Sequence, residues 1–517
     1  MIQMKAVLIL SFAIALYVCG CAINPVTGKR QLSLITEKQE IQIGNEQYLP
    51  SRQMEGGDYV VDPELTEYVN SIGEKLAAVS DRKLPYEFVV INNSVPNAWA
   101  LPGGKIAINR GLLLEMNNEA ELAAVLGHEI VHAAARHGAM SMERGMLLQG
   151  AVMAAGIAAS GSTYANLITT GAQLAATLIN QKYSRDAELE ADYYGMKYMA
   201  LAGYDPQAAV SLQELFLRLS KESDSDWFSR LFSSHPPTQE RVDANRETAS
   251  KLAVSGDIGI QSYNKGISHL QEKKEAYESY DTAQNALREN NPNEALRLIQ
   301  NAISVEPNEG LFYALLGDVY FKQHNYNEAI NHYDRALGLN NNFFYFYLQR
   351  GLVKNELDNP NEAVKDLEKS IELLPTATAF NTLGNISLAQ GDQQKAMSYY
   401  SEAATSNSEQ GKQAARSFVR LDLPGNPNKY LKIGLALSTD KLLVAKITNT
   451  TPVHVRIINM RFRYPAAKKQ LKESTMGIYE IIAPGKSIIL QTGIGPFKKK
   501  NAMKYIAAMV SRAEAVD

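Results

Sequence analysis

Residues 276 to 410 repeat with a period of 34 residues, and this periodicity limits what the chain can fold into. A unit of this length with small residues at fixed positions is typical of two amphipathic helices that cannot bury their apolar faces alone. The period therefore predicts four helix pairs stacked as a short α-solenoid. The alanines that define it stand 34, 34 and 33 residues apart, and glycines precede three of them by twelve residues: Ala295, Ala329, Ala363 and Ala396, with Gly317, Gly351 and Gly384.

These units resemble the tetratricopeptide repeat. The first unit has Ala283 in place of the glycine, and the third has Arg350 and Lys354 where apolar residues are expected, so either unit could be distorted or face solvent. The aromatic-rich segment 341–350 has two interpretations, a concave peptide-binding face or the core between helices, and the sequence leaves both open. In one complete unit the packing positions are filled by Tyr313, Leu316, Tyr320, Ala329, Tyr333 and Ala336.

The rest of the chain has the length and composition of further globular domains. Its 517 residues are 45% hydrophobic, and 52 basic against 55 acidic residues give a net charge of −3, so the overall charge offers no argument for a nucleic-acid partner. Before the repeats the pattern is mixed α/β, with a helix expected over 63–79 and strands over 86–92 and 104–109. After them, β-rich segments separated by turn residues predict an antiparallel β-sandwich: 430–438, 442–449, 454–464, 478–490 and 503–511.

The N-terminus predicts export and lipidation. Lys5 precedes an apolar run over 6–18, which is too short to span a bilayer but suits a signal peptide. The small Gly20 before Cys21 resembles a lipobox, so we expect Cys21 to be lipidated after removal of residues 1–20. Because no aspartate follows Cys21, the outer membrane facing the periplasm is the expected location. The alternative is an ordinary secretory signal peptide.

The segment His128-Glu-Ile-Val-His132 predicts a metal site on a helix that begins near Asn117 or Asn118 and ends at Gly138. Two histidines four residues apart project from one face of a helix, as two nitrogen ligands of one zinc require. Glu129 beside them would not bind the metal. It would act as the general base that takes a proton from the zinc-bound water.

A third ligand is expected from "YSRDAELEADYYG", residues 183–195. Glu188 and Asp192 stand one helical turn apart, so one could bind the metal and the other could orient a ligating histidine through its free ring nitrogen. Glu190 is a competing ligand, but it points to a different side of the helix from Asp192. The apolar stretch 140–182 between the two motifs is expected to form packed helices rather than a membrane span.

Five segments together resemble the gluzincin peptidase family that includes the CAAX prenyl proteases and the heat-shock protease HtpX. They are "NPVTGKRQLSL", "NAWALPGGKIAINRGLL", "HEIVHAAARHG", "YSRDAELEAD" and "SSHPPTQERV". With the lipobox and the repeats, the likeness extends to the BepA-like periplasmic lipoprotein proteases, although the terminal β region departs from their plan. The resemblance implies that His128, His132 and Glu188 bind one Zn²⁺. It also implies that Glu129 is the general base and that Asp192 and Arg185 are supporting residues, of which Arg185 would secure the local ion pairing.

Two further segments gain expected roles from this resemblance. Gly103, Gly104, Lys105 and Ile106 would belong to an edge strand that binds an extended substrate by β-augmentation. His235 would be a regulatory fourth ligand or an oxyanion stabiliser. The alternative is that His235 and Arg241 only hold the last helix of the domain. For His137, with Arg136, we expect a stabilising positive charge at a helix C-terminus.

The resulting prediction is a multidomain chain. A mostly helical α+β zincin peptidase domain (21–255) follows the signal peptide (1–20) and precedes an α-solenoid of tetratricopeptide repeats (276–410) and a β-sandwich (425–517). Its expected function is that of a zinc metalloendopeptidase of the bacterial envelope that cleaves unfolded or misassembled envelope proteins. Outer-membrane assembly machinery is a possible partner through the repeats, and the membrane through the anchor. The alternative is a periplasmic chaperone or assembly scaffold that acts mainly through its repeats.

Overall fold

The computed structural model describes residues 21–147, 177–222, 229–252, 255–465, 470–497 and 502–516. The predicted signal peptide and most of the stretch 140–182 lie outside the described residues. The chain divides after Pro375 into two compact units. Within the described ranges, no helix combines the length and the apolar character needed to cross a membrane.

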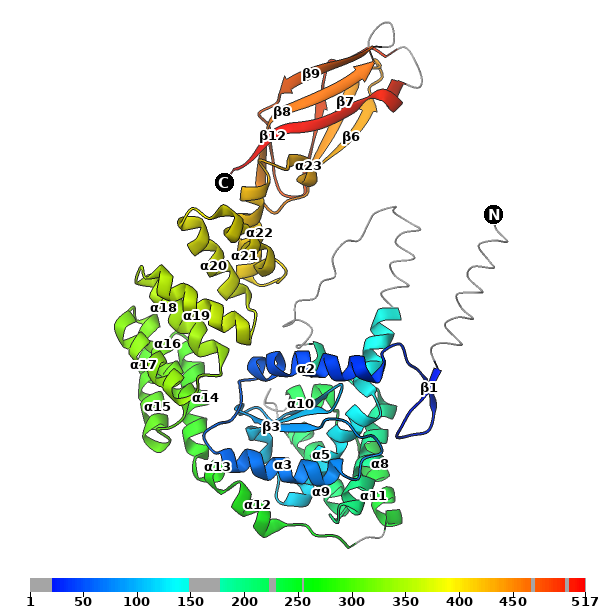
Figure 1. Ribbon diagram of the computed structural model, residues 1–517, viewed down its shortest axis with the longest axis vertical. Helices are drawn as coiled ribbons and strands as arrows, with labels where there is room; N and C mark the ends of the chain where they lie inside the picture. Colours follow the sequence, from blue (N-terminus) through cyan, green and yellow to red (C-terminus); the bar gives the residue numbers. More distant parts are fainter. Residues whose placement is uncertain are drawn as a thin grey trace, which may run out of the picture. The chain divides into compact units, whose positions relative to one another are not determined.

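A small, buried sheet lies at the centre of the N-terminal part of the first unit. Its order is β3 (Glu87–Ile91), β5 (Lys105–Asn109), β4 (Ala98–Leu101), with β5 parallel to β3 and antiparallel to β4. Figure 1 shows this sheet between the two helices α2 (Glu37–Met54) and α3 (Pro63–Ala77). The helix expected over 63–79 and the strands expected over 86–92 and 104–109 are therefore confirmed, with small changes at their ends.

The prediction that residues 103–106 form an edge strand is wrong. Gly103 and Gly104, with φ angles of 81° and 89°, form the turn that folds β4 back onto β5. Because β4 and β3 occupy both sides of β5, the backbone of Lys105 and Ile106 already pairs within the sheet. The edge on that side of the described sheet is β4.

The helix that carries the histidine motif is α5 (Glu119–Ala134). It begins as predicted, because the side chain of Asn118 accepts a hydrogen bond from the backbone N–H of Glu121. It ends four residues earlier than predicted, because Arg136 adopts a left-handed φ of 66° and a further helical segment starts at residue 137.

Helix α5 packs closely against α8 (Arg185–Leu201) at a pair of facing glycines. A Cβ atom on Gly195 would lie 3.0 Å from the backbone nitrogen of His128, and one on Gly127 would lie 3.2 Å from the carbonyl of Gly195. The missing side chains allow the two backbones to approach, which brings the two metal-binding motifs together. The other elements before the repeats are β1 (Cys21–Ile23), β2 (Arg30–Leu32), α4 (Arg110–Leu113), α9 (Gln207–Glu222), α10 (Ser229–Ser234), α11 (Gln239–Leu252), α12 (Ile260–Gly266) and α13 (Ser268–Glu272).

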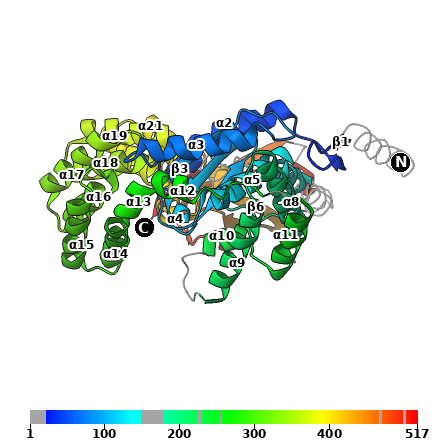
Figure 2. The same ribbon diagram turned by 90° about the horizontal axis from the view of Figure 1, so that it is seen from below.

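The repeated segment forms antiparallel helix pairs, as predicted. In the second pair, Gly317 lies against the ring of Tyr333, and in the third, Arg350 and Lys354 bind Asp366. These two cations therefore form ion pairs in place of the apolar contacts expected there. In the first unit the helices are α14 (Lys274–Arg288), α15 (Pro292–Val305), α16 (Gly310–Lys322), α17 (Tyr326–Leu339), α18 (Phe344–Glu356) and α19 (Pro360–Leu373); Figure 2 shows them side by side. In the second unit they are α20 (Ala377–Ala389), α21 (Gln393–Ala403) and α22 (Glu409–Asp422).

The aromatic segment 341–350 joins the repeats to the N-terminal part of the first unit. Phe343 and Phe346 are buried, and the ring of Phe343 lies against Gly57. The side-chain amide of Gln53 donates to the carbonyl of Asn342 at 2.7 Å and accepts from the backbone N–H of Phe344 at 2.7 Å. This part of the segment is therefore core and interface.

The second unit ends in two antiparallel sheets that share one buried apolar cluster. One has the order β11-β7-β6; in the other, β8 lies between β10 and β12 and also pairs with β9. The segment predicted as one strand over 478–490 is two strands, and β9 was not predicted. The elements are α23 (Pro427–Tyr430), β6 (Leu431–Leu437), β7 (Leu443–Asn449), β8 (His454–Pro465), β9 (Leu471–Gly477), β10 (Ile481–Ile482), β11 (Ser487–Gln491), a 3₁₀ turn (Ala502–Tyr505) and β12 (Ala507–Val516).

Candidate metal centre

Four side chains from three parts of the first unit meet at one point. His128 and His132 come from α5, Glu188 from the first turn of α8, and His235 follows α10. One donor atom from each lies within 4.8 Å of the others. The Nε2 atoms of His128 and His132 are 3.0 Å apart, and Nδ1 of His235 lies 3.3 Å from Nε2 of His128 and 3.1 Å from Oε1 of Glu188.

This donor set fits a zinc ion. Nδ1 of His128 lies 2.9 Å from Asp192, so it carries the proton, and Nε2 presents a lone pair to Nε2 of His132. Two such lone pairs 3.0 Å apart repel each other unless a cation lies between them. Ligands at about 2.0–2.1 Å in a tetrahedron are themselves about 3.3 Å apart, which agrees with the observed separations.

Asp192 and Arg241 support the ligands from behind. The guanidinium of Arg241 binds both oxygens of Asp192 at 2.7 Å, and its Nη1 reaches Oε2 of Glu188 at 2.9 Å. Burial would raise the pKa of Asp192, but the Arg241 charge and its hydrogen bonds hold this pKa below its usual value. Asp192 therefore stays ionised and fixes the orientation of His128.

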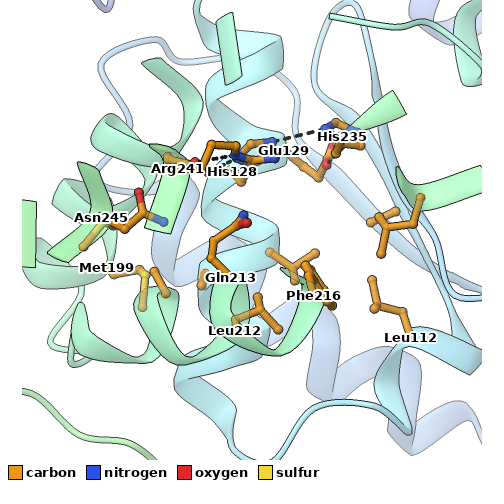
Figure 3. Close-up of a pocket in the computed structure, with 17 residues that line it drawn as sticks. Leu112, His128, Glu129, Met199, Leu212, Gln213, Phe216, His235, Arg241 and Asn245 are labelled. Carbon is orange, nitrogen blue, oxygen red and sulfur yellow. Dashed lines mark hydrogen bonds and ion pairs between the residues drawn. The ribbon is translucent and has the colours of Figure 1, made fainter. Parts of the chain in front are cut away.

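Glu129 lines a cavity of about 50 Å³ next to the ligands, shown in Figure 3, whose walls are partly apolar and partly polar. Burial raises the pKa of its carboxyl group. Its Oε2 has no hydrogen-bond partner among the described residues, and its Oε1 lies 3.7 Å from Nε2 of His235. A buried carboxylate oxygen without a partner, beside a space that can hold a water molecule, suits a general base. The apolar lining comes from Ala98, Leu112, Val125, Met199, Leu212, Phe216 and Leu231, among others.

A second chain of contacts supports His132. Nδ1 of His137 lies 2.9 Å from Nδ1 of His132, and Nε2 of His137 lies 3.5 Å from Oε2 of Glu190. Lys29 binds the other oxygen of Glu190 at 2.5 Å. One face of the His132 ring stacks on the ring of Tyr183, with 3.9 Å between the ring centroids. Both rotation and tilt of His132 are therefore restricted.

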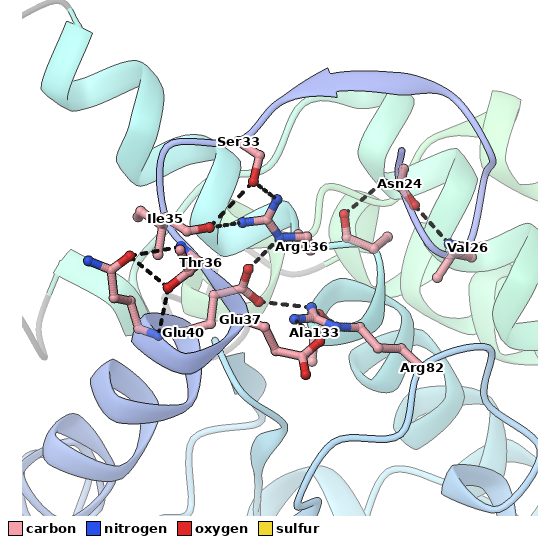
Figure 4. A network of polar contacts seen from close by, with 12 residues as sticks. Asn24, Val26, Ser33, Ile35, Thr36, Glu37, Glu40, Arg82, Ala133 and Arg136 are labelled. Carbon is pink, nitrogen blue, oxygen red and sulfur yellow. Dashed lines mark hydrogen bonds and ion pairs between the residues drawn. The ribbon is translucent and has the colours of Figure 1, made fainter. Parts of the chain in front are cut away.

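The N-terminal segment is tied to the end of the metal-binding helix by a buried polar network, shown in Figure 4. Arg136 binds Glu40 and donates to the hydroxyl of Ser33 at 2.7 Å, and Glu40 also binds Arg82 at 2.8 Å. The side chain of Asn24 donates to the carbonyl of Ala135 at 2.8 Å. These bonds satisfy polar groups where α5 ends, which explains the "NPVTGKRQLSL" and "ARHG" motifs.

Several predicted roles change with this geometry. Arg185 forms a local ion pair with Glu240, as expected, but this pair is exposed and does not support the metal site. Arg241 takes the supporting role. Glu190 contacts His137 rather than the ligand cluster. Sequence reasoning missed Tyr183 and Arg241 as supports of the site, since their contacts join segments that are distant in sequence. It also missed the role of His137, because the turn at Arg136 that brings His137 to His132, only five residues away, interrupts the regular helical spacing.

Comparison with known proteins identifies the domains. Residues 63–249 match the model of peptidase family M48; residues 317–358 match a TPR repeat, and 344–376 and 377–410 match the tetratricopeptide repeat. The beta-barrel assembly-enhancing protease of Escherichia coli K12 is 28% identical over 329 residues, 57% of this chain and 66% of that protein, slightly less than two thirds of its length. Metalloprotease YcaL of the same organism is 33% identical over 166 residues, 32% of this chain and 62% of that protein. Mitochondrial metalloendopeptidase OMA1 of Schizosaccharomyces pombe is 32% identical over 216 residues, 41% of this chain and 61% of that protein. Residues 63–249 are therefore similar to peptidase family M48 and residues 317–410 to tetratricopeptide repeats, and the donor set within the first of these segments fits a zinc ion.

Proposed function

We propose that the protein is a zinc metalloendopeptidase of the bacterial cell envelope that cleaves unfolded or misassembled envelope proteins. The observation that carries this proposal is the convergence of His128, His132 and Glu188 beside Glu129 and its cavity. Similar proteins include a beta-barrel assembly-enhancing protease and the mitochondrial metalloendopeptidase OMA1. The chain covers slightly less than two thirds of the first of these, so substrate and partners are proposals for this chain.

The residues of the site divide the chemistry between them. Zinc, when held by His128, His132 and Glu188, polarises the scissile carbonyl and lowers the pKa of a bound water. The carboxylate of Glu129 accepts a proton from the attacking water and gives it to the nitrogen of the leaving amine. Asp192 keeps the Nδ1 proton on His128, so that Nε2 faces the metal.

His235 is proposed as a regulatory fourth ligand. Its Nδ1 faces Glu188 and His128, and its Nε2 faces Glu129. A histidine in this position would occupy the place that water or substrate needs, because catalytic zinc sites keep one ligand position open. Movement of His235 would open the site, and the freed imidazole could then stabilise the oxyanion.

An extended substrate would bind along β4. This strand forms the edge of the described sheet on that side, and Ala98 at its start also lines the cavity beside Glu129. Backbone groups on a free strand edge can pair with an extended peptide of any sequence. This mode suits an enzyme that acts on unfolded chains.

The repeats are proposed to recruit these chains. A hollow of about 620 Å³ is lined by residues of α14, α16 and α18. A second hollow of about 350 Å³ lies where these helices meet earlier segments that include residues 54–56 and 92–94. Gln284, Leu315, Asp318 and Tyr345 line both, which gives the surface polar and apolar groups together. Outer-membrane assembly machinery is a proposed partner of the same surface.

The proposed location is the outer membrane facing the periplasm, with Cys21 lipidated after removal of residues 1–20. The proposed domains are 21–255, 276–410 and 425–517, of which the last would be a β-sandwich formed by its two sheets.

Two measurements on the chain lacking residues 1–21 test the catalytic part of the proposal: its zinc content and its cleavage of casein. Glu129→Gln should retain stoichiometric zinc and lose cleavage, whereas Glu240→Gln, a change of the same kind at an exposed glutamate, should cleave normally. Zinc without cleavage in the unaltered protein would favour the second candidate, a chaperone or scaffold. The hollows along the repeats favour that candidate, because they could bind unfolded chains without catalysis.

A further inference from the structure

The C-terminal β region is strongly basic, although the net charge of the whole chain is slightly negative. Residues 425–517 contain sixteen Lys and Arg but only five Asp and Glu, a net charge of +11. The whole chain has a net charge of −3, so residues 1–424 carry −14. An asymmetry of this size indicates an anionic partner for the basic part.

All four arginines of this region lie on one sheet face. The side chains of Val455, Ile457, Met460 and Phe462 point into the core, and Arg456, Arg461 and Arg463 alternate with them along β8. Arg512 lies on the neighbouring strand β12 opposite Asn459 and next to the buried Ala513. The outer face of β8 and β12, which we call the arginine face, therefore carries Arg456, Arg461, Arg463 and Arg512.

Most of this charge is not neutralised within the protein. Arg456 pairs with Glu514 at 3.0 Å. In the described part of the chain, Arg461, Arg463 and Arg512 form no ion pair, and all three are exposed. Glu473 stands opposite Arg463 in the strand register, so the face carries two acidic residues against four arginines.

Large apolar side chains are exposed among these arginines. Met509 stands opposite Arg461 and is 45% exposed, and Ile481 stands opposite Arg456 and is 48% exposed. Tyr479, just before β10, is 70% exposed, and Tyr505, just before β12, is 64% exposed. Arginine beside apolar and tyrosine side chains matches the boundary of a bilayer, where phosphates lie next to hydrocarbon and tyrosine is enriched.

We propose that the arginine face binds the phosphate groups of anionic lipids at a membrane surface. Arginine binds phosphate through two parallel N–H donors, and each basic residue near an anionic membrane adds to the attraction. The peptidase site plays no part in this interaction. The choice of lipid over nucleic acid rests on the proposed export of the chain, which would keep the protein away from nucleic acids.

Vesicle co-sedimentation tests this proposal with the chain lacking residues 1–21, so that no lipid anchor contributes. Vesicles of phosphatidylcholine are compared with vesicles that contain 30% phosphatidylglycerol. We expect binding only to the anionic vesicles and weaker binding as salt increases. The double variant Arg461→Glu, Arg463→Glu should bind them at least tenfold more weakly.

The matched control is Lys365→Glu, Lys369→Glu, which changes the net charge equally at exposed residues of α19. It should bind like the unaltered chain, and both double variants should keep their casein cleavage and thermal unfolding midpoint. Equal weakening by both would show that only net charge matters and would overturn the assignment to the arginine face. Binding to a single-stranded DNA oligonucleotide but to neither kind of vesicle would overturn the proposal that anionic lipid is the ligand. Absence of binding to both the vesicles and the DNA would overturn it as well.

Discussion

His137 is the residue whose substitution most directly tests how the metal site is built. Its Nδ1 lies 2.9 Å from Nδ1 of His132, and Glu190 and Lys29 continue the chain of contacts toward the surface. Loss of such a supporting contact to a ligating histidine typically weakens metal binding by about 10–100-fold. His137→Ala should therefore lower zinc affinity by that factor, equivalent to about 1.4–2.7 kcal/mol.

The assay is competition for zinc with a chelator of known affinity, so that the result does not depend on catalysis. The absorption spectrum of the Co²⁺-substituted protein gives a second readout, because it reports the ligand geometry directly. Glu190→Gln should have a smaller effect, since Glu190 lies 3.5 Å from His137 and is partly exposed. His324→Ala, at an exposed histidine in the repeats, is the control.

Unchanged zinc affinity and an unchanged Co²⁺ spectrum in His137→Ala would refute this reasoning. The contact with His132 would then be a consequence of packing alone. A lower thermal midpoint with normal zinc affinity would lead to the same conclusion, because it would show a structural role without any effect on the ligand.

Three further predictions concern single substitutions. Arg241→Met should destabilise the first unit by about 3–5 kcal/mol in urea unfolding, because it leaves the buried carboxylates of Asp192 and Glu188 without their cation; a change below 1 kcal/mol would contradict this. His235→Ala should retain zinc on the three remaining ligands and cleave casein faster, and slower cleavage would instead support an oxyanion role. Burial raises the pKa of Asp318 to about 7, although two tyrosine hydroxyls donate to its carboxylate. In the unfolded chain the carboxyl group of Asp318 ionises near pH 4. The contribution of Asp318 to the free energy of unfolding should therefore decrease as the pH rises from about 4 to about 7, by up to about 4 kcal/mol. Asp318→Asn should remove that dependence in thermal unfolding at pH 5 and pH 8, and an unchanged pH profile would refute the assignment.

The juxtaposition of the two candidate histidine ligands was predictable because their spacing is a property of a single helix. His128 and His132 share a helix face whatever surrounds them, and Asn118 caps that helix through its own neighbouring backbone. The repeats were predictable for a similar reason, because their period fixes the contacts between neighbouring helices.

The supporting contacts were not predictable, because they join residues that the fold alone brings together. Arg241 reaches Asp192 across 49 positions, and Lys29 reaches Glu190 across 161. The strand order could have been found, since Pro102-Gly103-Gly104 between two apolar segments is a turn signal that places a second strand beside β5. The arginine face required the strand register, which decides which side of β8 each residue occupies.

The bond between Asn24 and the carbonyl of Ala135 would limit the distance of the metal site from the membrane if Cys21 is lipidated as proposed. Asn24 lies three positions after Cys21, so a lipid on Cys21 would be only three residue lengths from a side chain that is bound to the end of the metal-binding helix. Three residues span at most about 11 Å. The catalytic site would then act within a thin layer next to the bilayer, so that a substrate would be selected by how close its exposed segment lies to the membrane.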